Sequence, residues 1–67
     1  MNETVPLFHT LNNQLAIILS HAELLEAKAT DDSQRARAAQ VVATTLEALA
    51  TTRQIRQTLE TRAPQSN

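Results

Sequence analysis

Two histidines, His9 and His21, and the absence of cysteine limit the nucleophilic chemistry open to this 67-residue sequence. A neutral, exposed imidazole nitrogen is a competent nucleophile toward phosphorus. Asn13 follows His9 by four residues, so on a helix the two side chains lie one turn apart on nearly the same face. An amide there can hydrogen-bond a phosphoryl oxygen or orient a water molecule. The spacing fits phosphoryl transfer at His9, and it leaves open that His9 is an ordinary solvated histidine.

His21 is the weaker candidate of the two histidines. It follows His9 by twelve residues, which places the two rings too far apart along one helix to share a metal ion. We expect His21 to lie on the flank of a helix bundle, and we expect no metal ligands in this sequence.

A first helix is predicted over residues 5–29. Thr4 is a suitable N-cap, and Pro6 falls in the first turn, where its missing N–H is tolerated. Apolar residues then recur at alternating spacings of three and four, which is typical of a helix packed lengthwise against a neighbour. This seam contains Phe8, Leu11, Leu15, Ile18, Ala22, Leu25 and Ala29. Three more apolar residues widen it: Ile17, Leu19 and Leu24.

A turn and a second helix follow the first. The polar residues 30–33 predict the turn, in which Asp31 can cap the next helix while Gln34 reaches back in a capping-box arrangement. The second helix is expected over residues 32–62 and has two adjacent apolar stripes. One contains Val42, Leu46 and Leu49, and the other contains Ala38, Val41, Ala48, Ile55 and Leu59.

Two long helices joined by a short turn must lie antiparallel, which predicts an all-α helical hairpin. In this hairpin, residues whose numbers sum to about 63 lie at the same height. The apolar stripe of the first helix is wider than one neighbouring helix can cover. We therefore expect residues 1–67 to form one domain that pairs with a second copy in a homodimeric four-helix bundle.

The composition excludes several functional classes. Six Lys and Arg against seven Asp and Glu give no electrostatic footprint for nucleic acid. The longest apolar run, Leu15 to Leu19, is far shorter than the ~20 residues that cross a bilayer, and no signal-peptide pattern opens the sequence. We expect no membrane insertion and a cytoplasmic location, for this chain alone or as part of a larger protein.

The residues around His9 carry a family resemblance. The run from His9 to Ile18, His-Thr-Leu-Asn-Asn-Gln-Leu-Ala-Ile-Ile, is followed by Ser20-His-Ala-Glu-Leu-Leu25. It resembles the H-box of the dimerisation and histidine-phosphotransfer domain of sensor histidine kinases. The likeness covers the first helix closely, whereas the second helix matches only in length and amphipathic character.

The resemblance implies a function in two-component signal transduction. His9 occupies the position of the phosphoacceptor histidine, which exchanges a phosphoryl group with an Asp of a response-regulator receiver domain. Asn13 stands where the family carries a Thr or Asn linked to phosphatase activity. The implied partners are a second copy, a receiver that holds its own Mg²⁺ and, for phosphorylation from ATP, a histidine kinase catalytic domain.

Three features depart from the family pattern. Thr10 follows His9, where the family usually has an acidic residue that assists proton removal from the imidazole. Gln14 stands where many members have a proline that bends the helix, so we expect the helix to continue without that kink. The sequence has no glycine, so it lacks the glycine-rich lid of the family's ATP-binding domain. ATP would act only through a separate or missing domain.

Further residues are candidates for partner binding. Arg53 and Arg56 lie near the height of His9, where a guanidinium can stabilise a phosphohistidine or meet the acidic pocket of a receiver. Alternatively, they are solvated cations near a helix C-terminus. Of the apolar residues around His9, Leu7 and Ala16 are candidates for docking, because Leu11 and Leu15 belong to the seam. The full expected set is Leu7, Thr10, Asn12, Ala16, Arg53 and Arg56.

Two other functional readings remain open at the level of sequence. One is a non-catalytic dimeric adaptor or inhibitor that docks on a kinase or response regulator without phosphotransfer. The other is an inert coiled-coil assembly module, which would bind no receiver. Whether the chain is an enzyme component therefore depends on whether His9 carries phosphate.

Overall fold

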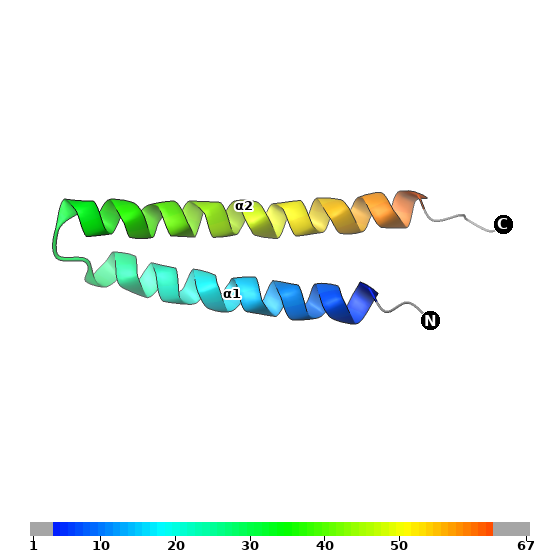
Figure 1. The fold of residues 1–67 in the computed structure, drawn as a ribbon, viewed down its shortest axis with the longest axis horizontal. Coiled ribbons are helices and arrows are strands. Elements are labelled where there is room, and N and C mark those ends of the chain that lie inside the picture. The colour runs from blue at the N-terminus through cyan, green and yellow to red at the C-terminus, as the bar shows by residue number, and fades with distance from the viewer. Residues whose placement is uncertain (1–3, 63–67) are drawn as a thin grey trace.

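Two α-helices and a short connection make up residues 4–62, the part of the chain that this computed structural model describes. α1 (Thr4–Lys28) and α2 (Asp32–Arg62) lie side by side and antiparallel (Figure 1). The predicted all-α hairpin is confirmed, and both helices begin and end within one residue of the expected bounds. α1 continues through Gln14 as one uninterrupted helix.

The connection is held by hydrogen bonds at the start of α2. The Asp31 carboxylate accepts a hydrogen bond from the Gln34 backbone N–H at 2.7 Å, and its carbonyl accepts one from the Arg35 N–H at 3.0 Å. Asp31 is therefore the N-cap, as predicted. The Gln34 side chain does not complete the capping box, because its Oε1 pairs with the Thr30 hydroxyl at 3.5 Å. Arg35 Nη2 donates to the carbonyl of Ala29 at 3.0 Å, which ties the end of α1 to the first turn of α2.

Loss of the cap should weaken the hairpin measurably. Asp31→Ala is expected to lower the free energy of unfolding by about 1 kcal/mol per chain, because the Gln34 N–H loses its partner. Urea denaturation at a fixed protein concentration measures the change. Asp31→Asn is the matched control, since it keeps a capping oxygen. Equal stability of the two variants would contradict the capping role.

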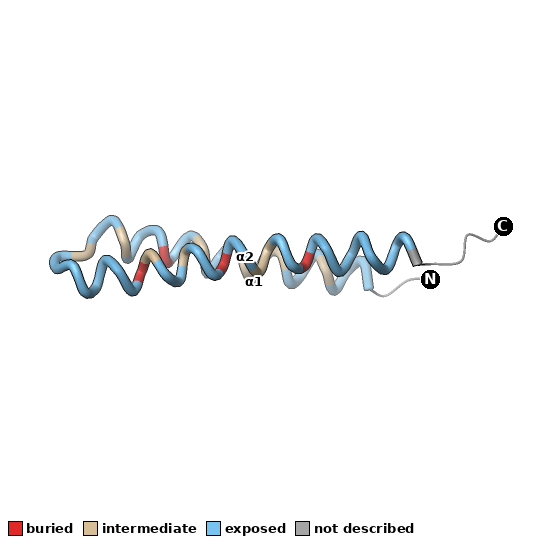
Figure 2. The backbone as a smooth tube through the Cα atoms, turned by 90° about the horizontal axis from the view of Figure 1, so that it is seen from above, coloured by how far each residue is buried: buried red, intermediate tan, exposed pale blue. Residues whose placement is uncertain are grey.

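The contact between the helices buries small side chains. Ala22 of α1 is 2% exposed and Ala38 of α2 is 7% exposed, and among the described residues no large side chain is fully buried (Figure 2). Thr45 and Thr52 are also buried, and their hydroxyls donate to the carbonyls of Val41 and Ala48, one turn earlier, at 2.7 and 2.6 Å. A single hairpin therefore has close helix contact without a substantial apolar core.

The predicted seam of α1 does not face α2 as a unit. Every second seam residue is buried or half-buried against α2, namely Phe8, Leu15, Ala22 and Ala29. The alternate members Leu11, Ile18 and Leu25 remain 40%, 47% and 66% exposed. Their place is taken by the next positions round the helix, Asn12, Leu19 and Glu26. One neighbouring helix covers only a narrow sector of α1, so α2 covers one edge of the wide stripe and leaves the other open.

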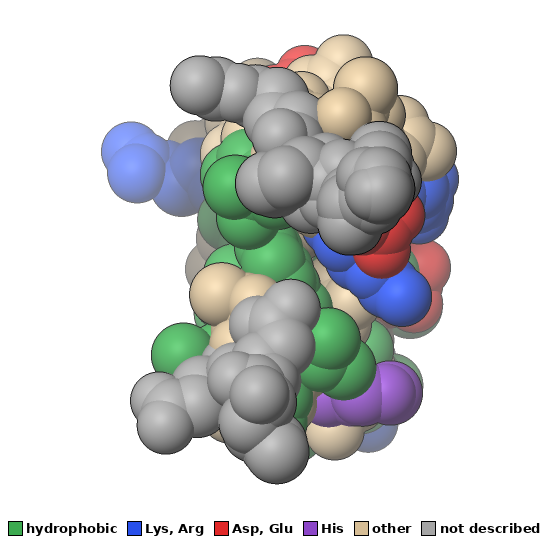
Figure 3. All heavy atoms as spheres, turned by 90° about the vertical axis from the view of Figure 1, so that its right-hand side faces the viewer, with side chains coloured by type: hydrophobic (Ala, Val, Ile, Leu, Met, Phe, Trp, Pro, Cys, Tyr) green, Lys and Arg blue, Asp and Glu red, His purple; other side chains and the backbone are tan. Residues whose placement is uncertain are grey.

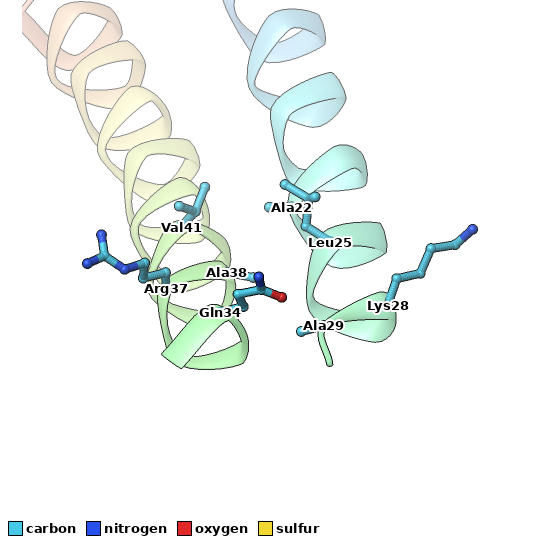
Figure 4. Close-up of a pocket in the computed structure, with 8 residues that line it drawn as sticks. All are labelled: Ala22, Leu25, Lys28, Ala29, Gln34, Arg37, Ala38 and Val41. Carbon is cyan, nitrogen blue, oxygen red and sulfur yellow. The ribbon is translucent and has the colours of Figure 1, made fainter. Parts of the chain in front are cut away.

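The open edge continues onto α2 as a single surface, which we call the apolar face: Leu11, Ile18, Leu25, Val41 and Ile55. Leu25 and Val41 line a groove of about 420 Å³ near the connection (Figure 4). Leu11 and Ile55 line a second groove near the open end of the hairpin. Ile18 lies seven residues from both Leu11 and Leu25, so it lies on the same side of α1. With the register of the hairpin, the apolar face spans 17 residues of α1, roughly 25 Å of a hairpin that is 57 Å long.

Candidate functional site

His9 and Asn13 lie one helical turn apart near the start of α1, and both side chains are exposed. Within residues 4–62, no hydrogen bond or ion pair engages the His9 ring, so both of its nitrogens are available to solvent. α1 fixes the spacing of the two side chains because both positions lie well inside the helix. The pair can therefore present an imidazole and an amide to one ligand.

The His9 side chain lies on the side of the hairpin opposite the apolar face. It precedes Leu11 by two residues, and two residues correspond to about 200° around a helix. Ala16 follows His9 by seven residues, or about two turns, and is exposed on the same side. A second chain bound to the apolar face would leave His9, Asn13 and Ala16 accessible.

The other α1 candidates are spread around the helix. Leu7 is exposed, but it also lies two residues from His9 and so points to the other side, toward the apolar face. Thr10 is exposed about 100° round from His9. Asn12 is half-buried toward α2. The structure therefore groups Asn13 and Ala16 with His9 and separates Leu7 from them.

The two arginines of α2 lie near the height of His9. In the groove at the open end, Leu11 occurs with Thr52 and Leu15 with Ala48, and the numbers of each pair sum to 63, as the antiparallel register predicts. Arg53 and Arg56 follow directly on α2. Viewed from this end, a histidine side chain lies on the same side of the molecule as basic and acidic side chains (Figure 3).

The two arginines differ in their partners. Arg56 Nε lies 3.4 Å from Glu60 Oε2, one turn later on α2, and both side chains are at least half exposed. Arg53 is exposed and makes no ion pair within residues 4–62. Neither guanidinium hydrogen-bonds to His9 in the described part of the chain. We predicted the same role for both arginines, although the i,i+4 spacing of Arg56 and Glu60 already indicates an ion pair on one helix.

Leu46 is a surface residue that the sequence analysis placed in an apolar stripe and did not consider for binding. It is 50% exposed and precedes Arg53 by seven residues, so it lies on the same side of α2. Its height corresponds to residue 17 of α1, next to Ala16. Leu46 and Ala16 therefore form a small apolar patch about two turns from His9 toward the connection.

Comparisons of the chain with protein-family models, with curated proteins and with solved structures find no match. Within residues 4–62, no group of three or more His, Cys, Asp or Glu side chains is placed to hold a metal ion. Neither described helix has a stretch that is both long and apolar enough to cross a membrane.

Proposed function

We propose that this chain is a dimerisation and histidine-phosphotransfer domain of a two-component signalling system, in which His9 exchanges a phosphoryl group with an Asp of a receiver domain. One observation carries the proposal. The exposed His9 lies opposite the apolar face, so a dimer formed through that face leaves the imidazole free. The resemblance of residues 9–25 to the H-box of sensor kinases agrees with this arrangement.

The partner on the apolar face is a second copy of the chain. The five residues of this face are 40–66% exposed, and monomeric proteins rarely leave so long an apolar surface in water. The face includes residues of both helices, so a second hairpin that packs on it contacts α1 and α2 together. A twofold axis brings the same patch of two chains together and closes a four-helix bundle. In such a dimer the large apolar side chains of the two apolar faces bury one another, whereas a single hairpin leaves them exposed.

The transfer requires few groups from this chain. The lone pair of His9 Nε2 attacks the phosphorus of the phosphorylated receiver Asp, the new P–N bond forms, and the P–O bond to the Asp carboxylate breaks. The reverse reaction returns the phosphoryl group to Asp. Asn13 hydrogen-bonds a phosphoryl oxygen from one turn away. The receiver's own Mg²⁺ supplies the charge stabilisation at its acyl phosphate.

Thr10 makes phosphorylation from ATP the less favourable route, because this residue offers no carboxylate beside His9 to accept a proton. Phosphoryl donors of the acyl-phosphate type place a weaker demand on such a base. A phosphorylated receiver is therefore the favoured source of the phosphoryl group, and ATP through the catalytic domain of another kinase is the second.

The same threonine favours the second candidate function, a dimeric adaptor that docks on a receiver or a kinase without phosphotransfer. In that case the patch of Ala16 and Leu46 binds the partner, and His9 takes no part in chemistry. The adaptor predicts binding that does not change when His9 is replaced.

Transfer of radioactive phosphate separates the two functions. The chain is mixed with receiver domains that have been phosphorylated on Asp, and in a second arm with a kinase catalytic domain and ATP. Phosphotransfer predicts label on the chain that is stable in alkali and lost in acid, as expected of a P–N bond. Receiver binding without label supports the adaptor. No label from any donor, including the small molecule phosphoramidate, would exclude phosphotransfer.

A further inference from the structure

Within residues 4–62, Arg53 and Arg56 are the cations at the height of His9. Of the two, Arg53 is the one without an ion pair that would hold it away from His9. Arg56 lies against Glu60 at 3.4 Å, so its charge is already partly compensated. Arg53 is exposed and makes no ion pair in the described part of the chain. Before Arg53 in the sequence, the nearest described acidic residue is Glu47. It lies six residues away and faces a different side of α2.

Arg53 and His9 lie on the same side of the hairpin. Leu11 and Ile55 line one groove on the apolar face. His9 precedes Leu11 by two residues and Arg53 precedes Ile55 by two residues, so each lies about 200° round its helix from that groove. Both side chains therefore point to the opposite side. Their numbers sum to 62, one less than the register value, so they also share a height.

We propose that Arg53 binds the oxygens of a phosphoryl group carried by His9, an inference that rests on the proposed function and names a residue of α2 in the same site. Packed helices lie about 8–10 Å apart, a gap that a long arginine side chain can bridge to reach a phosphoryl group beyond the imidazole ring. The planar guanidinium donates two parallel hydrogen bonds to phosphate oxygens. Because Arg53 is solvated, its approach costs no buried charge.

Arg53 acts as a positioning residue for the phosphorylated state. It holds the phosphoryl oxygens over the face that carries Asn13 and leaves the phosphorus open to the receiver. Arg56 contributes less, because contact with the phosphoryl group would require it to leave Glu60. Arg37, near the connection, lies at the height of residue 26 of α1, 17 residues from His9, and takes no part.

Phosphorus NMR of the phosphorylated chain tests the assignment. The full-length chain is labelled with phosphoramidate, the signal of phosphorylated His9 is assigned by its absence in His9→Gln, and the pH at which that signal undergoes its second ionisation is measured. A nearby guanidinium favours the dianion, so Arg53→Gln should move this midpoint upward by about half a pH unit at low salt. High salt should reduce the difference between the wild type and the variant.

Arg37→Gln is the matched control, since it removes the same charge from an exposed position at the other end of the hairpin. Its midpoint should equal that of the wild type. An unchanged midpoint in Arg53→Gln overturns the role of Arg53 while phosphorylation of His9 still supports the proposed function. A shift of equal size in Arg37→Gln also overturns it, because the effect would then be one of net charge. Absence of phosphohistidine at position 9 overturns both proposals.

Discussion

Replacement of His9 by glutamine is expected to abolish phosphoryl transfer from a receiver to the chain while its fold and dimerisation persist. Glutamine keeps a polar side chain of similar length at an exposed helical position, but its amide nitrogen is not a nucleophile toward phosphorus. The loss of acid-labile label should be complete when the donor is a phosphorylated receiver, whereas phosphoramidate should still label the exposed His21. Circular dichroism and sedimentation should match those of the wild type.

His21→Gln provides the control for the His9 experiment. It removes the second histidine, which is also exposed and therefore accessible to a small phosphoryl donor. Label from phosphoramidate is expected at both histidines at first, whereas transfer from a receiver should require His9 alone. Receiver-dependent label that survives His9→Gln, or that is lost in His21→Gln, would contradict the role of His9 as the phosphoacceptor.

The helices and the turn were predictable because each has a local cause. The three-and-four spacing of apolar residues specifies α1, and Asp31 forms the N-cap of α2 with its own following residues. The antiparallel register follows from helix length and a short connection. None of these features needs information from a distant part of the chain.

The rotation of the helices about their axes was not predictable in the same way. The predicted stripes of α2 contained only apolar residues, so Thr45 and Thr52 were not expected in the contact between the helices. Both are buried in the contact with α1, because each hydroxyl is satisfied by a carbonyl of its own helix. Close approach at Ala22 and Ala38 also leaves Leu11 and Leu25 at the edge of the contact, where they line grooves between the helices. These outcomes depend on packing between the helices.

In the candidate site, too, the local features were predictable and the features that depend on packing between the helices were not. The relation of His9 to Asn13 is local and was read from an i,i+4 spacing, and the height of Arg53 followed from the hairpin register. The side of each helix on which a residue lies was harder to assign across the hairpin. Leu7 was therefore grouped with Ala16, although α1 places the two on different sides, and Leu46 was overlooked.

Ile18→Glu is expected to convert the proposed dimer to single chains and to remove most of the helical structure. Ile18 lies in the middle of the apolar face and is 47% exposed in a single hairpin. In the proposed dimer it becomes buried, so a carboxylate there would lose its water without gaining a partner. That penalty is several kcal/mol per chain and occurs twice per dimer. Sedimentation at micromolar concentration measures the association, and circular dichroism measures the helix content.

The loss of helix follows from the small core of the single hairpin. Since no large side chain of the described residues is fully buried, the separated chain has little apolar burial to offset the entropy of ordering two long helices. Ser20→Glu is the control, because it adds the same charge to α1 at an exposed position about 200° away from Ile18. It should remain a helical dimer. An unchanged dimer in Ile18→Glu would show that the apolar face is not the surface through which two chains associate, and a helical monomer would show that a single hairpin folds without its partner.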